Sequence, residues 1–147
     1  MGYIEETGAC RFLRDARIAP IYEGTTGIQA ADLAGRKLAS DQGAGMAELV
    51  AEIREAALEL ERSTDTRVAS IGRALAAGVQ ALEDATAGML QALASQPDAA
   101  LASSVDYLML TGYVCGGWQM GRAALVAAAS LGARLTTSAT TGTRLCR

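Results

Sequence analysis

The residues with the clearest chemical potential lie at positions 18–29, in the segment Ile-Ala-Pro-Ile-Tyr-Glu-Gly-Thr-Thr-Gly-Ile-Gln. Glu23 follows apolar residues and precedes small ones, so partial desolvation by Ile21 and Tyr22 would raise its affinity for a proton and make it a usable general base. Gly24 leaves space for a ligand beside the carboxylate. Free backbone amides near residues 25–27 would meet an anion or a carbonyl oxygen. The residues alone leave a second interpretation open, in which Glu23 only interacts with the dipole of the following helix.

The absence of histidine narrows the chemistry of the whole chain. It excludes Ser-His-Asp and Cys-His catalysis, histidine metal sites and histidine pH switches. Cys10, Cys115 and Cys146 show no ligand spacing. We therefore expect no metal site and no disulfide framework.

Charge and hydropathy exclude two further classes of partner. The net charge is −3, and the cations are scattered arginines apart from Lys37, so we expect no nucleic-acid partner. The longest uncharged stretch of the apolar C-terminal third, residues 107–121, is fifteen residues long, short of the roughly 20 needed to cross a bilayer. Glu5 and Glu6 stand where a secretory signal would carry cations, and we expect a cytoplasmic protein.

The elements that must position the segment around Glu23 are helices, because the chain is rich in alanine and lacks β-branched runs of strand length. We expect a helix over residues 3–17 and an irregular connection over residues 18–24, with Ile21 and Tyr22 held by packing. A capping box of Thr26 and Gln29 predicts a helix that begins at Thr26 and ends near residue 39. Residues 40–45 form a predicted linker.

Beyond the linker, apolar residues recur at helical spacing and predict an antiparallel three-helix bundle over residues 46–131. An amphipathic helix covers residues 47–62, and a break follows at 63–66. The next helix carries a near-heptad seam that ends at residues 96–98. The last helix covers residues 97–131, and its small residues predict close packing. The seam consists of Val68, Ile71, Leu75, Val79, Leu82, Thr86, Met89 and Leu93, and the small residues are Gly112, Gly116, Gly117 and Gly121.

Two further predictions concern particular side chains. Arg14, Asp15 and Arg17 are expected to form a salt-bridge network beside the loop that carries Glu23. Tyr113 and Trp118 are expected to be core residues of the last helix.

Two motifs carry a resemblance to a known family. Residues 14–17 read Arg-Asp-Ala-Arg, and residues 21–29 read Ile-Tyr-Glu-Gly-Thr-Thr-Gly-Ile-Gln. Together with residues 1–8, they resemble the C-terminal part of acyl-CoA dehydrogenases. The resemblance is closest to the long bacterial subfamily that carries an additional C-terminal helical domain. It covers about forty residues, and the later helices match only in pattern.

The resemblance implies an FAD-dependent oxidoreductase that converts acyl-CoA thioesters to trans-2-enoyl-CoA, as in fatty acid β-oxidation. It implies that Glu23 removes the α-proton, that Gly24 borders the substrate, and that Thr25, Thr26 and Gly27 line the FAD site. It also implies an electron-transferring flavoprotein as the partner that receives the electrons.

The predicted fold class is all-α. Residues 1–42 are interpreted as the end of an acyl-CoA dehydrogenase C-terminal helical domain, residues 43–135 as the additional bundle, and residues 136–147 as a disordered tail. We expect a fragment that is inactive alone and binds no FAD. The alternative is a non-catalytic interaction or dimerisation module. Apolar faces at Ile28, Leu33 and Leu38 favour a homo-oligomer.

Overall fold

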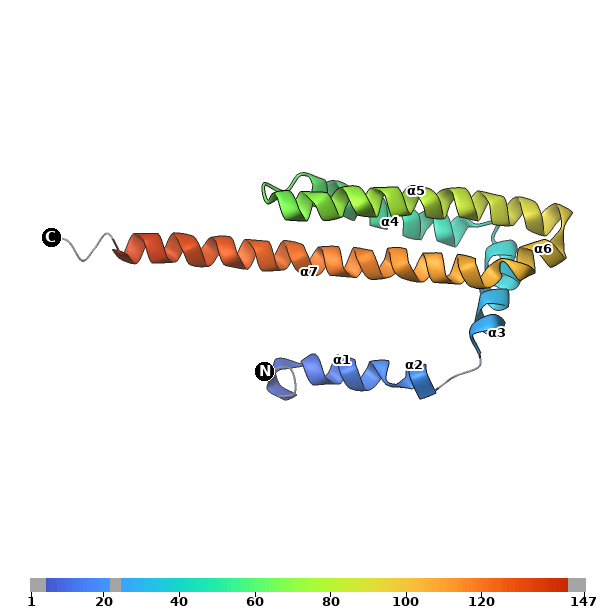
Figure 1. Cartoon of the computed structure of the whole chain (residues 1–147), viewed down its shortest axis with the longest axis horizontal. Helices are drawn as coiled ribbons and strands as arrows, with labels where there is room; N and C mark the ends of the chain where they lie inside the picture. The colour runs from blue at the N-terminus through green and yellow to red at the C-terminus, as the bar shows by residue number, and fades with distance from the viewer. Residues whose placement is uncertain (1–4, 22–24, 143–147) are drawn as a thin grey trace.

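The computed structural model describes residues 5–21 and 25–142, and all the regular structure in these ranges is helical (Figure 1). This confirms the predicted all-α class. Within the described residues, no helix is long and apolar enough to cross a bilayer.

Three long helices lie side by side and form an antiparallel bundle (Figure 1). They are α4 (Ala44–Glu61), α5 (Thr66–Ser95) and α7 (Ser104–Gly142). The side chains of Ile53, Leu60, Val79 and Leu82 are completely buried between them. The predicted bundle is confirmed, because the apolar stripe of each helix faces the other two.

Glycine allows two of the closest approaches in the bundle. A Cβ atom added to Gly72 of α5 would lie 2.6 Å from the backbone nitrogen of Glu61, and one added to Gly121 of α7 would lie 2.7 Å from a methyl group of Leu60. The prediction of close packing is thus confirmed at Gly121. It is wrong at Gly112 and Gly116, where an added Cβ would meet nothing within 4 Å, because these two glycines face away from α4 and α5.

Tyr113 and Trp118, both predicted as core residues of the last helix, differ in burial. Trp118 is half-buried and packs against the core. Tyr113 is 72% exposed, so its predicted place in the core is wrong.

The predicted last helix is divided in two. α6 (Pro97–Ala102) is followed by Ser103, whose hydroxyl donates to the carbonyl oxygens of Ala99 and Ala100 at 3.2 and 3.1 Å. Such side-chain bonds compete with the helical pattern, and α7 begins one residue later. α7 then continues to Gly142, seven residues into the segment predicted as a tail. That prediction relied on the polarity of serine and threonine, which lowers helix propensity only slightly.

The N-terminal part consists of short helices: η1 (Glu5–Thr7), α1 (Ala9–Ala16), α2 (Ile18–Ile21), α3 (Thr26–Ala31) and the π-helix η2 (Asp32–Leu38). The helix predicted for residues 3–17 is interrupted at Gly8, which has a φ of 75°. The irregular connection predicted from residue 18 is wrong over Ile18–Ile21. Proline is tolerated in the first turn of a helix because its missing N–H would have no partner there.

α1 packs on η1 and α2, and these three lie apart from the bundle, whereas α3 and η2 pack against α7 (Figure 1). The apolar side chains of α1 and α2 are consequently open to solvent. Phe12 is 78% exposed, and Leu13, Ile18 and Ile21 are also exposed. No described segment buries these residues.

Candidate functional site

The described part of the predicted site, residues 25–27, lies at the start of α3, which packs against α7. Glu23 and Gly24, the predicted base and its neighbour, lie outside the described residues, as does Tyr22. Thr25, Thr26 and Gly27 are described, and the structure places them together at the start of α3. The predicted roles of Glu23 and Gly24 therefore stay predictions.

Thr25 is the residue that precedes α3. Its carbonyl oxygen accepts a hydrogen bond of 2.8 Å from the backbone N–H of Gln29. This is the first hydrogen bond of the helix, so the capping position is Thr25 and not Thr26. The Thr25 side chain makes no capping bond, and Thr26 is the first helical residue. The predicted start of the helix is confirmed, but the capping box is wrong. The first N–H groups of α3 have no acceptor within the helix and can meet a ligand.

Two isoleucines flank this helix start and are exposed. Ile21 is 71% exposed and Ile28 is 68% exposed. The prediction that packing holds Ile21 is wrong, because no described segment covers it. Of the apolar faces expected for self-association, the one at Ile28 is open, but Leu33 is half-buried and Leu38 is buried, since η2 turns them toward the bundle.

The helix start has the features that a bound cofactor with polar and apolar parts requires. Thr26 is exposed, Thr25 is half-buried, and a Cβ added to Gly27 would meet nothing within 4 Å. The hydroxyls, the first helical N–H groups and the exposed isoleucines lie on adjoining positions of one short segment. Hydroxyl and backbone N–H groups of this kind are what FAD, the cofactor that the resemblance implies, would require of this segment. The described residues contain no group of side chains that would hold a metal ion.

Charged side chains near the site are paired with one another. In η2, Arg36 donates from Nε and Nη2 to the two carboxylate oxygens of Asp32, at 2.5 and 2.9 Å. This bond lowers the pKa of the Asp32 carboxyl, and Lys37 lies 3.6 Å from the same group. The paired charges leave this cluster without a free acid or base.

The predicted network of Arg14, Asp15 and Arg17 is wrong. Arg14 pairs with Glu5 at 2.8 Å, and Arg11 lies 4.0 Å from Asp15. Residues 14 and 15 are adjacent on a helix and point in different directions, so each finds a partner on its own side. These are exposed surface pairs with little energetic weight.

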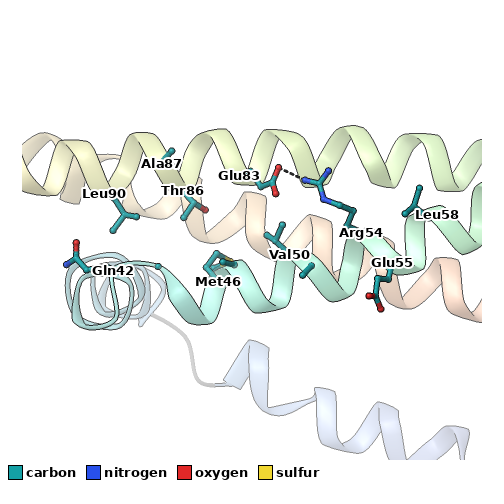
Figure 2. A pocket seen from close by; sticks show the side chains of 13 residues that line it. Gln42, Met46, Val50, Arg54, Glu55, Leu58, Glu83, Thr86, Ala87 and Leu90 are labelled. Atoms are coloured by element: carbon teal, nitrogen blue, oxygen red, sulfur yellow. Dashed lines mark ion pairs between the residues drawn. The ribbon is translucent and has the colours of Figure 1, made fainter.

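A concave region lies between α4 and α5, on the bundle and away from residues 25–27 (Figure 2). This open groove of about 500 Å³ is lined by apolar side chains such as Met46, Val50 and Leu90. An ion pair between Arg54 and Glu83 crosses it. This pair is not predictable from the sequence, because each residue lies on the solvent face of its own helix and only the packing of α4 on α5 joins them.

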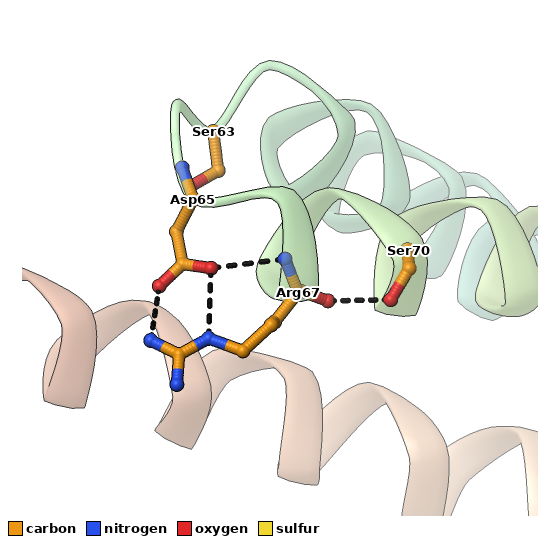
Figure 3. A network of polar contacts seen from close by, with 4 residues as sticks. All are labelled: Ser63, Asp65, Arg67 and Ser70. Atoms are coloured by element: carbon orange, nitrogen blue, oxygen red, sulfur yellow. Dashed lines mark hydrogen bonds and ion pairs between the residues drawn. The ribbon is translucent and has the colours of Figure 1, made fainter.

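Asp65, at the start of α5, has a carboxyl whose pKa lies well below its ordinary value (Figure 3). It accepts from the backbone N–H of Arg67 at 2.9 Å and from its guanidinium at 3.1 and 2.7 Å. These bonds lower the pKa of Asp65 from 3.8 to about 2. The shift results first from the guanidinium of Arg67 and then from the backbone N–H groups at the start of α5, so Asp65 is a structural residue that caps this helix.

Two family models of known proteins match the chain, one over its N-terminal part and the other over the rest. Residues 28–143 match the family described as "Acetyl-CoA dehydrogenase C-terminal like", and residues 1–38 match "Acyl-CoA dehydrogenase, C-terminal domain". The second match includes the segment that contains Glu23. None of the solved structures matches the chain.

Two curated relatives align with most of the chain. A 3-methylmercaptopropionyl-CoA dehydrogenase from Ruegeria pomeroyi is 47% identical over 138 residues, which cover 89% of this chain and 22% of the relative. The broad-specificity linear acyl-CoA dehydrogenase FadE5 from Mycobacterium tuberculosis is 35% identical over 148 residues, which cover 92% of this chain and 23% of the relative. The chain thus spans about a fifth of the length of the curated relatives it matches.

Proposed function

Since the chain belongs to the acyl-CoA dehydrogenase family and corresponds to its C-terminal portion, we propose that it supplies the base-bearing end of an enzyme that oxidises acyl-CoA thioesters to trans-2-enoyl-CoA. One relative is named for 3-methylmercaptopropionyl-CoA and the other for linear acyl-CoA. Both names contain a CoA thioester, and this supports acyl-CoA thioesters as the substrate class. The observation that carries the proposal is the match of residues 1–38, because it includes Glu23 and the residues around it.

The proposed reaction removes one proton and one hydride from adjacent carbons. Glu23 takes the proton from Cα, next to the thioester carbonyl, which is the most acidic C–H of the substrate. The backbone N–H of Glu23 donates to the thioester oxygen and stabilises the negative charge that develops there. Gly24 leaves room for the substrate beside the carboxylate.

Thr25, Thr26 and Gly27 would hold FAD through their hydroxyls and the first N–H groups of α3. When bound, FAD supplies the acceptor for the hydride that leaves Cβ. The open space at Gly27 and the lack of a capping bond at Thr25 support this role. Larger side chains in this segment would narrow the approach to the helix start.

The remaining parts of the proposal concern the whole protein. We propose an electron-transferring flavoprotein as the acceptor of the electrons, a cytoplasmic location and a homo-oligomeric state. We propose that residues 1–42 belong with the flavin-binding part and residues 43–135 form the additional domain, a division that the two family matches support. The 147 residues alone are proposed to be inactive, because Thr25, Thr26 and Gly27 are the only residues assigned to FAD.

The test is a chimera in which these 147 residues replace the corresponding segment of the Ruegeria relative. We expect the chimera to bind flavin and to reduce an artificial electron acceptor when an acyl-CoA is added. Glu23→Gln should abolish this turnover and leave the visible flavin spectrum unchanged. Glu59→Gln, on the exposed face of α4, is the matched control and should keep full activity.

Two results would oppose the proposal. Turnover that survives Glu23→Gln would remove Glu23 from the role of base. A yellow preparation of the isolated 147 residues, with flavin absorption and turnover, would show that this chain needs no further segment.

A further inference from the structure

Lys37, in η2, is the only lysine of the chain, and all the other basic side chains are arginines. Its side chain is 57% exposed. A guanidinium stays protonated in proteins, whereas the amine of a lysine can lose its proton and then acts as a nucleophile. Lys37 is therefore the one side-chain amine of this chain that can attack an electrophile, and the proposed dehydrogenation does not use it.

The ion pair of Lys37 is the weaker of the two that Asp32 makes. η2 is a π-helix, in which residues five apart lie on the same side, so Lys37 is placed beside Asp32. Arg36 donates to both oxygens of this carboxylate at 2.5 and 2.9 Å. The Nζ atom of Lys37 lies 3.6 Å from one of them, which is longer than a good hydrogen bond. Loss of the charge on Lys37 would thus leave Asp32 with both of its bonds from Arg36.

The side chain of Lys37 also lines a shallow pocket of about 180 Å³ between η2 and α4. The walls of this pocket include the half-buried apolar side chains of Leu33, Met46 and Leu49. A water molecule occupies about 30 Å³ and a methylene group is of similar size, so the pocket has room for about six carbon atoms. An aliphatic chain attached to Lys37 can therefore bury apolar surface against the same residues that flank the lysine.

The charge around the pocket disfavours acidic chains. Asp41 lies in its lining, and its carboxylate accepts hydrogen bonds of 2.9 Å from the backbone N–H groups of Gly43 and Gly45. These bonds lower the pKa of Asp41, so the carboxylate is negatively charged at neutral pH. A chain that ends in a carboxylate would be repelled by Asp41, whereas an uncharged aliphatic chain would not.

We propose that Lys37 is a site of covalent acylation by short, uncharged acyl-CoA thioesters, and that the pocket between η2 and α4 holds the transferred acyl chain. The neutral Nζ attacks the thioester carbonyl carbon, a C–N bond forms and the C–S bond breaks. Coenzyme A leaves as the thiolate, and the nitrogen releases one proton to solvent. The product is an amide, and no oxidant or reductant takes part. The inference rests on the proposed function for its reagent, an acyl-CoA thioester.

The test measures which thioester Lys37 prefers. The chain is incubated separately with hexanoyl-CoA, acetyl-CoA and succinyl-CoA at about pH 9, where a larger fraction of lysine amines is neutral. Arg73→Lys, at an exposed position of α5, provides a second amine in the same molecule. Peptide mass spectrometry gives the ratio of acylation at Lys37 to acylation at position 73, and this ratio cancels the different reactivities of the three reagents.

We expect the ratio to be at least about fivefold higher with hexanoyl-CoA than with acetyl-CoA, because the longer chain buries several methylene groups. With succinyl-CoA, the ratio should fall below the acetyl value. Equal ratios for the three thioesters would overturn the proposal, because Lys37 would then react only as an exposed amine. Absence of acylation at Lys37 would overturn it as well.

Two variants of α4 test the role of the pocket. Leu49→Ala removes part of the apolar wall and should reduce the preference for hexanoyl over acetyl at least twofold. Leu58→Ala, on the same helix but outside this pocket, is the matched control and should leave the preference unchanged. Far-UV circular dichroism checks that both variants are as helical as the unchanged chain. A preference that Leu49→Ala does not alter would show that the pocket does not hold the chain, and would refute the proposal.

The acylation test and the dehydrogenase test can fail separately. Acylation of Lys37 requires neither flavin nor Glu23, so Glu23→Gln should give the same ratios as the unchanged chain. An inactive chimera with the expected ratios would reject the proposed dehydrogenation and support the site at Lys37. An active chimera with equal ratios for all three thioesters would reject the site alone.

Discussion

Gly72→Ala should lower the free energy of unfolding, although alanine has a higher helix propensity than glycine, because Gly72 lies in close contact with α4. Alanine at this position would place its Cβ 2.6 Å from the backbone nitrogen of Glu61 and 2.9 Å from the carbonyl oxygen of Ala57. Both are backbone atoms of a neighbouring helix, so no rotation of a side chain can relieve the contact. Gly72→Ala should therefore separate α4 from α5.

The magnitude follows from two opposed contributions. Replacing a helical glycine by alanine stabilises the helix by about 1 kcal/mol. Overpacking costs about 1 to 3 kcal/mol, and a backbone contact belongs at the upper end. Gly72→Ala should thus lower the free energy of unfolding by about 2 kcal/mol. Gly88→Ala, in the same helix but facing open space, should raise it by about 1 kcal/mol.

The assay is urea unfolding followed by far-UV circular dichroism, at one protein concentration for all chains. The two variants should differ by about 3 kcal/mol in the free energy of unfolding, with similar denaturant slopes. If Gly72→Ala stabilised the chain as much as Gly88→Ala, the close approach of α4 and α5 would be refuted.

Three further predictions concern the bundle and its caps. Leu82→Ala, at a completely buried position, should lower the free energy of unfolding in urea by about 2 to 5 kcal/mol, and Leu58→Ala, 45% exposed, should cost well under half as much. Tyr107→Phe removes a hydroxyl that lies 2.9 Å from that of Thr86 and should cost about 0.5 to 1.5 kcal/mol; in a double-mutant cycle, it should cost less once Thr86→Val is present. Asp65 has a pKa of about 2 in the folded chain, below its ordinary value of 3.8, so its contribution to stability is complete above pH 4 and is lost as the pH falls toward 2. The melting temperature of Asp65→Asn should fall less over that interval than that of the wild type, and equal slopes in thermal scans would contradict this assignment.

The bundle was predictable because its signals are local and repeated. The seam from Val68 to Leu93 places an apolar residue on one side of the helix at every turn, and the structure buries most of that seam. The turn before α5 was equally predictable, since residues 63–66 interrupt the pattern. Asp65 follows the general rule that a side-chain acceptor precedes the first free N–H groups of a helix.

The errors occurred where two local preferences compete or where contact with a distant segment decides. Thr25 and Thr26 both suit the start of a helix, and the backbone bond from Gln29 to Thr25 selected the earlier position. The last helix is divided at Ser103, whose hydroxyl donates to the carbonyl oxygens of Ala99 and Ala100, and polarity and spacing do not specify this position. Ile21 was expected to be buried because it is apolar, but burial requires a partner surface.

The sequence by itself determined the helical class, the breaks between the long helices and the family motif around Glu23, because each depends on residue type and short-range spacing. Only the tertiary structure decided which glycines lie against a neighbouring helix and which face open space. Gly112 and Gly121 look alike in the sequence, but a Cβ on one meets nothing and a Cβ on the other meets Leu60. The physical reason is that helical periodicity defines the faces of a helix, whereas the packing of α4 and α5 on α7 decides which of those faces is covered.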